Sequence, residues 1–303
     1  MQRWTYLFII TGAVLWGTIG LFVHKLYDYG FSPLQVVAIR VIFASLFLLV
    51  YITLKKPALL KIKVQDCKYF IGTGIMSIVF FNWCYFTAIK ETSLSIAAIL
   101  LYTGPIFVTL LSRIFFQEYL TKNKIAALVI TFLGCALVIE IFPNSSEAVS
   151  FYSFIVGLGA GFGYALYSIF GKYALIKYNA LTVTTYTFIF ASLVMIPTTG
   201  LWNSWELFLD EEVLSYSIGL GFIPTVLAFF LYTTGLTYVE SSTGSIMTTI
   251  EPVVATLMGV ILFGEALSPW QVMGVLLVIT AVILVQPKEK KINGSIEDSS
   301  FLD

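Results

Sequence analysis

Two ionisable side chains lie deep inside apolar stretches of the sequence, where charge is costly. Glu251 is the ninth residue of the run 243–263 and precedes Pro252, and Arg40 is the eighth residue of the run 33–54. A charged group at the centre of a bilayer costs roughly 2.5–3.5 kcal/mol on insertion scales, so such residues are functional candidates. The carboxylate of Glu251 suits an ammonium group or a proton, and the planar guanidinium of Arg40 suits a carboxylate.

Each of these two residues also has a structural interpretation. Glu251 could be a neutral or paired side chain that fixes the helix beside the bend that Pro252 introduces. Arg40 could reach the membrane surface along its apolar stem, or bind a main-chain carbonyl as a clamp. The sequence alone leaves both alternatives open.

Polar and aromatic residues in the other apolar runs form a second candidate group. An asparagine in lipid needs hydrogen-bond partners and should therefore face the protein interior. Aromatic rings can stack on a substrate or hold an ammonium group by cation–π attraction, but they also serve helix packing, and 16% of the chain is Phe, Trp or Tyr. The candidates are Trp16, Asn82, Tyr85, Tyr102, Tyr164 and Tyr232.

The sequence offers no motif for a cofactor or for catalysis. One histidine and three cysteines without a CxxC pair are too few for a conventional zinc site. The alternating glycines of segment 157–163 lie inside an apolar run with no strand before them, which argues against a dinucleotide loop. There is no Walker motif. We therefore expect no metal, no cofactor and no enzymatic reaction.

The composition places these candidates in a membrane protein. Of the residues, 58% are hydrophobic and only 11% are charged, whereas soluble domains carry about 25% charged residues. Apolar runs of about 20 residues predict membrane-spanning helices. The sequence contains ten such runs, at 4–23, 33–54, 67–89, 95–116, 124–142, 151–171, 180–201, 214–236, 243–263 and 270–286.

The distribution of basic residues predicts the orientation of these spans. With the N-terminus inside, fourteen Lys and Arg residues fall on the inner side, and only Lys25 and Lys90 on the outer side. Basic loops remain in the cytoplasm, so both termini, including the polar tail 287–303, are predicted to be cytoplasmic in a multi-pass protein of the cell membrane. Arg113, Glu118, Lys172 and Glu265 lie at span ends. Of these, Arg113, Glu118 and Glu265 are expected to anchor their helices at the membrane surface.

The two halves of the chain repeat each other at an offset of 147 residues without a gap. The segment 42–46 (IFASL) recurs at 189–193, Pro105 corresponds to Pro252, and Glu118 to Glu265. Because each half contains five spans, the second copy enters the membrane inverted. The predicted fold is therefore an all-α membrane protein of two inverted five-helix repeats, 4–142 and 151–286. Such repeats are typical of secondary transporters with a site near the midplane.

The sequence resembles the EamA-like branch of the drug/metabolite transporter superfamily over about residues 5–286. This resemblance implies a secondary transporter, often an exporter of amino acids or other small metabolites, with a cavity lined by spans 1, 3, 4, 6, 8 and 9. The first half departs from the repeat, with Gly104-Pro105 where the second half has Glu251-Pro252. The motifs that carry the resemblance are Gly12-Ala13-Val14-Leu15-Trp16-Gly17, Arg40, Glu251-Pro252 and Gly264-Glu265.

These observations predict a transporter of small metabolites, with amino acids and export as the leading hypothesis. The alternative is an exporter of multiple drugs or quaternary cations, which an aromatic cavity with Glu251 would also serve. Lipid flipping and sugar transport stay open, whereas a membrane enzyme or sensor would need a catalytic cluster or output domain that the sequence lacks. The expected partners are a small-molecule substrate and membrane lipid, without nucleic acid. One chain supplies both halves, so a monomer suffices and the oligomeric state is left open.

Overall fold

The computed structural model describes residues 2–140, 150–264 and 266–286, and every regular element in these ranges is helical. Glu265 and the predicted tail 287–303 lie outside the described residues. Eight helical stretches of the described part are long and apolar enough to cross a membrane. They are α1–α2 (Gln2–Gly17, Ile19–Asp28), α3 (Pro33–Lys55), α4–η3–α5 (Cys67–Ile71, Gly72–Val79, Phe80–Glu91), α6–α7 (Leu94–Leu101, Gly104–Phe116), α9 (Phe151–Leu175), α10 (Ala180–Thr198), α11–η5–α12 (Glu211–Gly221, Phe222–Leu227, Ala228–Tyr238) and α13–α14 (Ser241–Met247, Ile250–Phe263).

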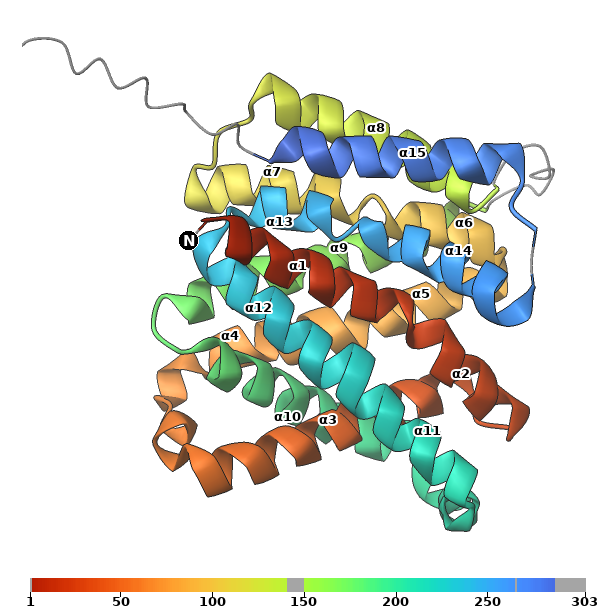
Figure 1. The fold of residues 1–303 in the computed structure, drawn as a ribbon. Coiled ribbons are helices and arrows are strands. Elements are labelled where there is room, and N and C mark those ends of the chain that lie inside the picture. Colours follow the sequence, from red (N-terminus) through yellow and green to blue (C-terminus); the bar gives the residue numbers. More distant parts are fainter. Residues whose placement is uncertain (1, 141–149, 265, 287–303) are drawn as a thin grey trace, which may run out of the picture.

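Two further helices, α8 (Lys122–Val138) and α15 (Pro269–Val285), have 17 residues each. They are shorter than the eight long stretches, so the expected number of ten spans is not confirmed. They run side by side along one face of the bundle (Figure 1). Short 3-10 turns in the connections complete the described helices: η1 (Pro57–Leu60), η2 (Val64–Asp66) and η4 (Leu201–Leu209).

Close contact between α8 and α15 depends on two glycines. A Cβ atom added to Gly274 would lie 2.6 Å from the main-chain oxygen of Gly134, and one added to Gly134 would lie 2.9 Å from Val278. Small residues let helices approach closely in membranes, where van der Waals packing contributes strongly to association.

Replacing Gly274 by alanine is expected to destabilise the protein by about 1–3 kcal/mol, because the new methyl group meets backbone that cannot rotate away. The measurement is the temperature at which the detergent-solubilised protein loses half of its monodisperse peak. Gly20→Ala is the matched control, because a Cβ there meets nothing within 4 Å. Equal melting of the two variants would contradict this packing.

The structure keeps the register of the sequence repeat. The N-cap residues Ser32 and Asn179, which begin α3 and α10, are 147 residues apart, and so are Thr121 and Ser268, which begin α8 and α15. Each of these side chains accepts a hydrogen bond from a main-chain N–H of its helix, which satisfies a donor that the helix leaves free. These two pairs of equivalent helices therefore start at equivalent residues in both halves.

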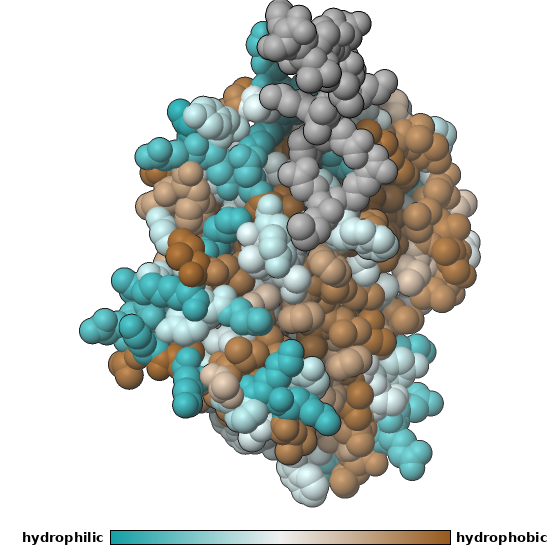
Figure 2. Space-filling model, turned by 60° about the vertical axis from the view of Figure 1, so that its left-hand side comes forward, coloured by the Kyte–Doolittle hydropathy of each residue, from teal (hydrophilic) through white to brown (hydrophobic). Residues whose placement is uncertain are grey.

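The surface of the bundle has an apolar flank and a strongly basic end. Figure 2, turned to bring the left-hand end of Figure 1 forward, shows hydrophilic side chains gathered there and hydrophobic side chains along the flank. At this basic end, Lys177 donates to Asp66 at 2.6 Å, and this hydrogen bond raises the pKa of the Lys177 ammonium. The helices α3 and α9 end there and α4 begins there (Figure 1). We call it the basic end because these helix ends and the segments beside them contain Lys55, Lys56, Lys61, Lys63, Lys68, Lys172 and Lys177.

Candidate functional site

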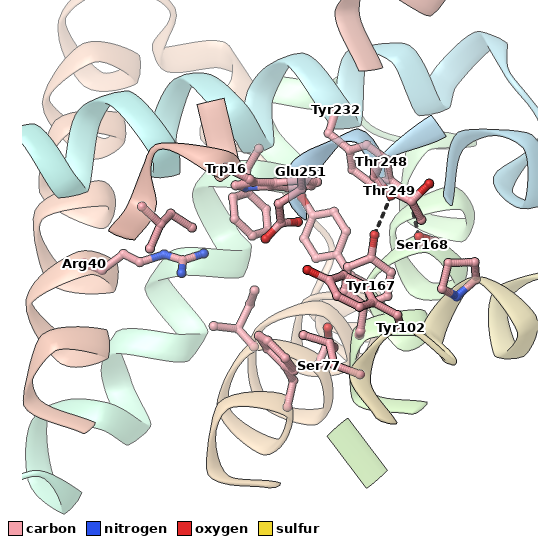
Figure 3. A pocket seen from close by; sticks show the side chains of 17 residues that line it. Trp16, Arg40, Ser77, Tyr102, Tyr167, Ser168, Tyr232, Thr248, Thr249 and Glu251 are labelled. Atoms are coloured by element: carbon pink, nitrogen blue, oxygen red, sulfur yellow. Dashed lines mark hydrogen bonds between the residues drawn. The ribbon is translucent and has the colours of Figure 1, made fainter. Parts of the chain in front are cut away.

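A cavity of about 100 Å³ lies between the two repeats. A water molecule needs roughly 10–15 Å³ of such space, so the cavity has room for several waters or a small organic solute. Most of its lining is aromatic or apolar, with a few polar groups (Figure 3). The lining residues are Trp16, Ile19, Arg40, Ser77, Ile78, Phe81, Leu101, Tyr102, Pro105, Tyr164, Tyr167, Ser168, Phe229, Tyr232, Thr248, Thr249 and Glu251.

Interruptions in two spanning helices bring polar groups to this cavity. The stretch α6–α7 breaks at Tyr102, just before Pro105, and α13–α14 breaks at Thr249, just before Pro252. Proline lacks an N–H and clashes with the preceding turn, which favours a break at these positions. As a result Glu251 lies in the first turn of α14 and faces the cavity.

Arg40 and Glu251 bring opposite charges to the same cavity without forming an ion pair. Figure 3 shows both side chains directed into the space between α3 and α14. The Arg40 guanidinium lies 5.5 Å from the centre of the Phe229 ring. Among the described residues, neither charged group has a hydrogen-bond or salt-bridge partner. Both side chains are partly buried and line the cavity, where a charge without a partner is costly. A ligand in the cavity could supply the missing partners.

Trp16 adds an unpartnered donor to the cavity wall. Its side chain is 6% exposed, and its indole N–H has no hydrogen-bond partner among the described residues. The ring is held in place by Phe229 and Tyr232, whose ring centres lie 4.9 and 5.2 Å away. Buried donors are nearly always satisfied, so this N–H has the properties expected of a ligand contact.

Three hydrogen bonds between hydroxyl groups tie α9 to α12 and α13 beside the cavity. Tyr164 bonds to Thr248 at 2.6 Å, Tyr167 to Thr233 at 2.6 Å, and Ser168 to Tyr232 at 2.7 Å. Each bond satisfies hydroxyl groups in a wall that is otherwise mostly apolar. The wall on this side is therefore fixed by polar contacts as well as by ring packing.

Buried charges link the repeats at the basic end. Glu118 is 7% exposed and accepts hydrogen bonds from the main-chain N–H groups of Ser241 (2.7 Å) and Ser242 (3.1 Å), at the start of α13. Lys124 donates to the Glu240 carboxylate at 2.6 Å and to the Ser242 hydroxyl at 2.9 Å. The expectation that Glu118 is a surface anchor is wrong, because it is buried in this contact.

Lys172 forms a second contact between helices at the basic end. Its ammonium donates to the main-chain oxygens of Leu236 (2.6 Å) and Val239 (2.8 Å), at the end of α12. Carbonyls at the end of a helix lack partners within it, so a basic side chain there satisfies them. Lys172 thereby joins α9 to the end of α12.

Within the described residues, the helix packing at the basic end is not repeated at the opposite end of the bundle. At the basic end α7 packs against α13 and α9 against α12. The repeat equivalents of these pairs, α14 with α6 and α2 with α5, make little or no contact within the described ranges. The two repeats therefore have different conformations, and the bundle is packed more closely at the basic end.

The structure brings six of the eight predicted site residues around the cavity: Trp16, Arg40, Tyr102, Tyr164, Tyr232 and Glu251. The two others lie outside its lining. Asn82 is buried and donates to the main-chain oxygen of Ile78 in its own helix at 2.7 Å, and Tyr85 stacks on Phe81 at 5.9 Å. That any of these residues binds substrate stays a prediction.

Two small serines and one phenylalanine that also line the cavity were not identified from the sequence. Ser77 and Ser168 are small polar residues that look like ordinary helix-packing positions, and Phe229 is one of 26 phenylalanines. Ser168 follows Tyr164 by four residues and so shares its helix face, which is the one signal that was present. Among the described residues, no group of three His, Cys, Asp or Glu side chains is placed to hold a metal ion.

Comparison with known proteins places this architecture among transporters. The chain is 27% identical to an uncharacterized transporter of Archaeoglobus fulgidus, covering 91% of this chain and 94% of that protein. It is 25% identical to the uncharacterized transporter YwfM of Bacillus subtilis, covering 94% of both chains. The threonine/homoserine exporter RhtA of Escherichia coli (strain K12) is 26% identical, covering 85% of this chain and 84% of that protein.

Comparisons of fold and of family agree with these similarities. One solved crystal structure matches the fold with a TM-score of 0.78 at 15% sequence identity, covering 94% of this chain and 96% of that one. The model of the EamA-like transporter family matches residues 3–140 and again residues 151–286, which are the two halves of the repeat. The chain therefore belongs to the EamA-like transporter family, and it is a membrane transporter rather than an enzyme.

Proposed function

We propose that this protein is a secondary transporter that moves a small zwitterionic metabolite, an amino acid or a related compound, out of the cell. The observation that carries this proposal is the pair Arg40 and Glu251, which bring unpartnered opposite charges into one cavity. An amino acid carries the two complementary charges on neighbouring atoms. The printed name of the relative RhtA, an exporter of threonine and homoserine, supports the same substrate class.

The cavity offers a distinct partner to each end of such a substrate. The substrate carboxylate would bind the Arg40 guanidinium, a strong charge-assisted contact, and the indole N–H of Trp16. The substrate ammonium would bind the Glu251 carboxylate, with the rings of Tyr102 and Tyr164 nearby for cation–π attraction. The limited volume of the cavity favours small side chains on the substrate.

We further propose that α8 and α15 also cross the cell membrane, giving ten spans, and that the basic end lies in the cytoplasm with both chain termini. The excess of Lys and Arg at that end supports the orientation. In this arrangement the closely packed end is cytoplasmic, and the conformation is the one that opens outward. Transport would follow from rocking of the inverted repeats around the cavity, which then opens to each side in turn.

A second candidate is an exporter of quaternary cations, and the aromatic lining of the cavity favours it. Phe81, Phe229 and Tyr167 add to the tyrosines named above. The positive charge of Arg40 in the same cavity repels a ligand that carries only positive charge. This repulsion makes a zwitterion the better match.

The test of the proposed function is counterflow of radiolabelled amino acids into proteoliposomes that contain the purified protein. We expect counterflow for small amino acids and none for sugars or nucleosides. Counterflow of none of the amino acids would contradict the substrate class. Repeating the assay with and without a pH gradient then tells whether protons drive the cycle, since facilitated diffusion would be independent of the gradient.

A further inference from the structure

Two lysines hold equivalent positions in the inverted repeats. Lys172 in α9 and Lys25 in α2 are 147 residues apart, and each lies three residues before the last residue of its helix. The helices that end beside them match in the same way, because α12 ends at Tyr238 and α5 at Glu91, also 147 residues apart. A lysine thus occupies the equivalent position of the repeat at each end of the bundle.

The two lysines differ in what they contact. Lys172 is partly buried and donates to the main-chain oxygens of Leu236 and Val239 at the end of α12. Lys25 is exposed and makes no hydrogen bond or ion pair with any described residue. The oxygens that correspond to those of α12 belong to Ile89 and Thr92, and no described side chain donates to them.

We propose that Lys25 closes the opposite end of the bundle during the other half of the cycle, by donating to the main-chain oxygens of Ile89 and Thr92. This inference rests on the alternating access proposed above. When two inverted copies exchange conformations, a contact made by one copy in one state is made by the other copy in the other state. Lys172 and Lys25 are then positioning residues that stabilise the two closed ends in turn.

If the two repeats exchange conformations, replacing Lys172 and replacing Lys25 should shift the equilibrium between the two states in opposite directions. A hydrogen bond to a charged group contributes about 1.5–3 kcal/mol, so losing it shifts a two-state equilibrium about tenfold or more. Removing Lys172 weakens only the state with the basic end closed, and removing Lys25 weakens only the state with the opposite end closed. A lysine that merely sits at the membrane surface would shift neither.

The experiment follows access to the cavity from each face of the membrane. A single reporter cysteine, Ser77→Cys, lines the cavity in a chain whose Cys67, Cys84 and Cys135 are replaced by alanine. The labelling rate with a membrane-impermeant maleimide is measured in vesicles of each orientation, without any substrate. The readout is the ratio of the rate from the opposite end to the rate from the basic end.

We expect K25Q to raise this ratio about tenfold and K172Q to lower it about tenfold. The controls K90Q and K122Q, at the opposite and basic ends, should leave it unchanged, and K25R should restore it because arginine keeps the charged donor. Lys25 is exposed in the described conformation, so K25Q keeps the test decisive even if K172Q fails to fold.

The possible results separate this inference from the proposed function. A ratio in K25Q equal to that in K90Q, or shifted in the same direction as in K172Q, overturns the lysine exchange and leaves transport untouched. A reporter that is reached from one face only, in the wild type and in every variant, overturns alternating access and the exchange together. Opposite shifts support the exchange whatever the transported substrate is.

Discussion

Replacing Glu251 by glutamine is expected to lower amino-acid counterflow at least about thirtyfold. The amide keeps the size of the side chain but removes the only acidic group among the lining residues of the cavity. The substrate ammonium would then be buried without a counter-charge, while Arg40 keeps its own. Losing one partner of a buried charge pair costs about 2 kcal/mol or more, which corresponds to about thirtyfold in affinity.

The controls for this variant use the same chemical change elsewhere. Glu206→Gln alters an exposed carboxylate in the turn between α10 and α11 and should leave counterflow at the wild-type rate. Glu251→Asp keeps the charge and should retain more activity than the amide. Wild-type counterflow in Glu251→Gln would show that the substrate ammonium does not bind this carboxylate. An unchanged resistance of cells to cationic dyes in the same variant would count against the quaternary-cation alternative.

Replacing Arg40 by glutamine is expected to change substrate selectivity as well as rate. An amino acid loses the partner of its carboxylate and should be transported at least about thirtyfold more slowly. The corresponding amine, which has no carboxylate, no longer meets the positive charge and should be transported as well as, or better than, in the wild type. The measurement is the ratio of counterflow rates for an amino acid and its decarboxylated amine.

A conservative variant separates charge from geometry at this position. Arg40→Lys keeps the positive charge but loses the planar fork that binds both carboxylate oxygens, so we expect intermediate rates with selectivity retained. Lys122→Gln, which removes an exposed charge at the basic end, should leave the ratio unchanged. If Arg40→Gln slows amino acid and amine by the same factor, Arg40 supports the structure of the cavity and does not bind the carboxylate.

The repeat is the part of the fold that the sequence predicted most firmly. Glycine, proline and acidic residues that keep one register, such as Pro105 with Pro252, are not produced by matching apolar letters. The structure confirms this register in residues that the sequence comparison did not use, such as the N-caps Ser32 and Asn179. The predicted number of ten spans is not confirmed, because α8 and α15 have only 17 residues each.

The sequence repeat did not predict that equivalent residues of the two halves have different surroundings in the structure. Tyr85 and Tyr232 are repeat equivalents, and the sequence predicted that both approach the site. Only Tyr232 lines the cavity, where it bonds to Ser168, whereas Tyr85 stacks on Phe81. A sequence repeat predicts that the two halves have similar folds. It does not predict which end of the bundle is closely packed, because that depends on the equilibrium between conformations of the whole protein.

The depth of a charge in a span indicated correctly which charged residues line the cavity. Arg40 and Glu251 were singled out by depth alone, and both line the cavity. Charges at span ends were harder to interpret. Glu118 lies where a surface anchor would be, yet the start of α13 folds over it and buries its carboxylate. Contacts of this kind join residues more than a hundred positions apart, so local sequence carries little information about them.

Binding of chemically blocked amino acids to the purified protein shows whether Arg40 and Glu251 together recognise a zwitterion. The amino acid with the fastest counterflow is bound in radiolabelled form, and three competitors are compared: the unlabelled amino acid, its methyl ester and its N-acetyl derivative. We expect both derivatives to compete at least about thirtyfold more weakly than the parent, because each lacks one charge of the pair. Equal competition by all three would contradict recognition of a zwitterion by Arg40 and Glu251.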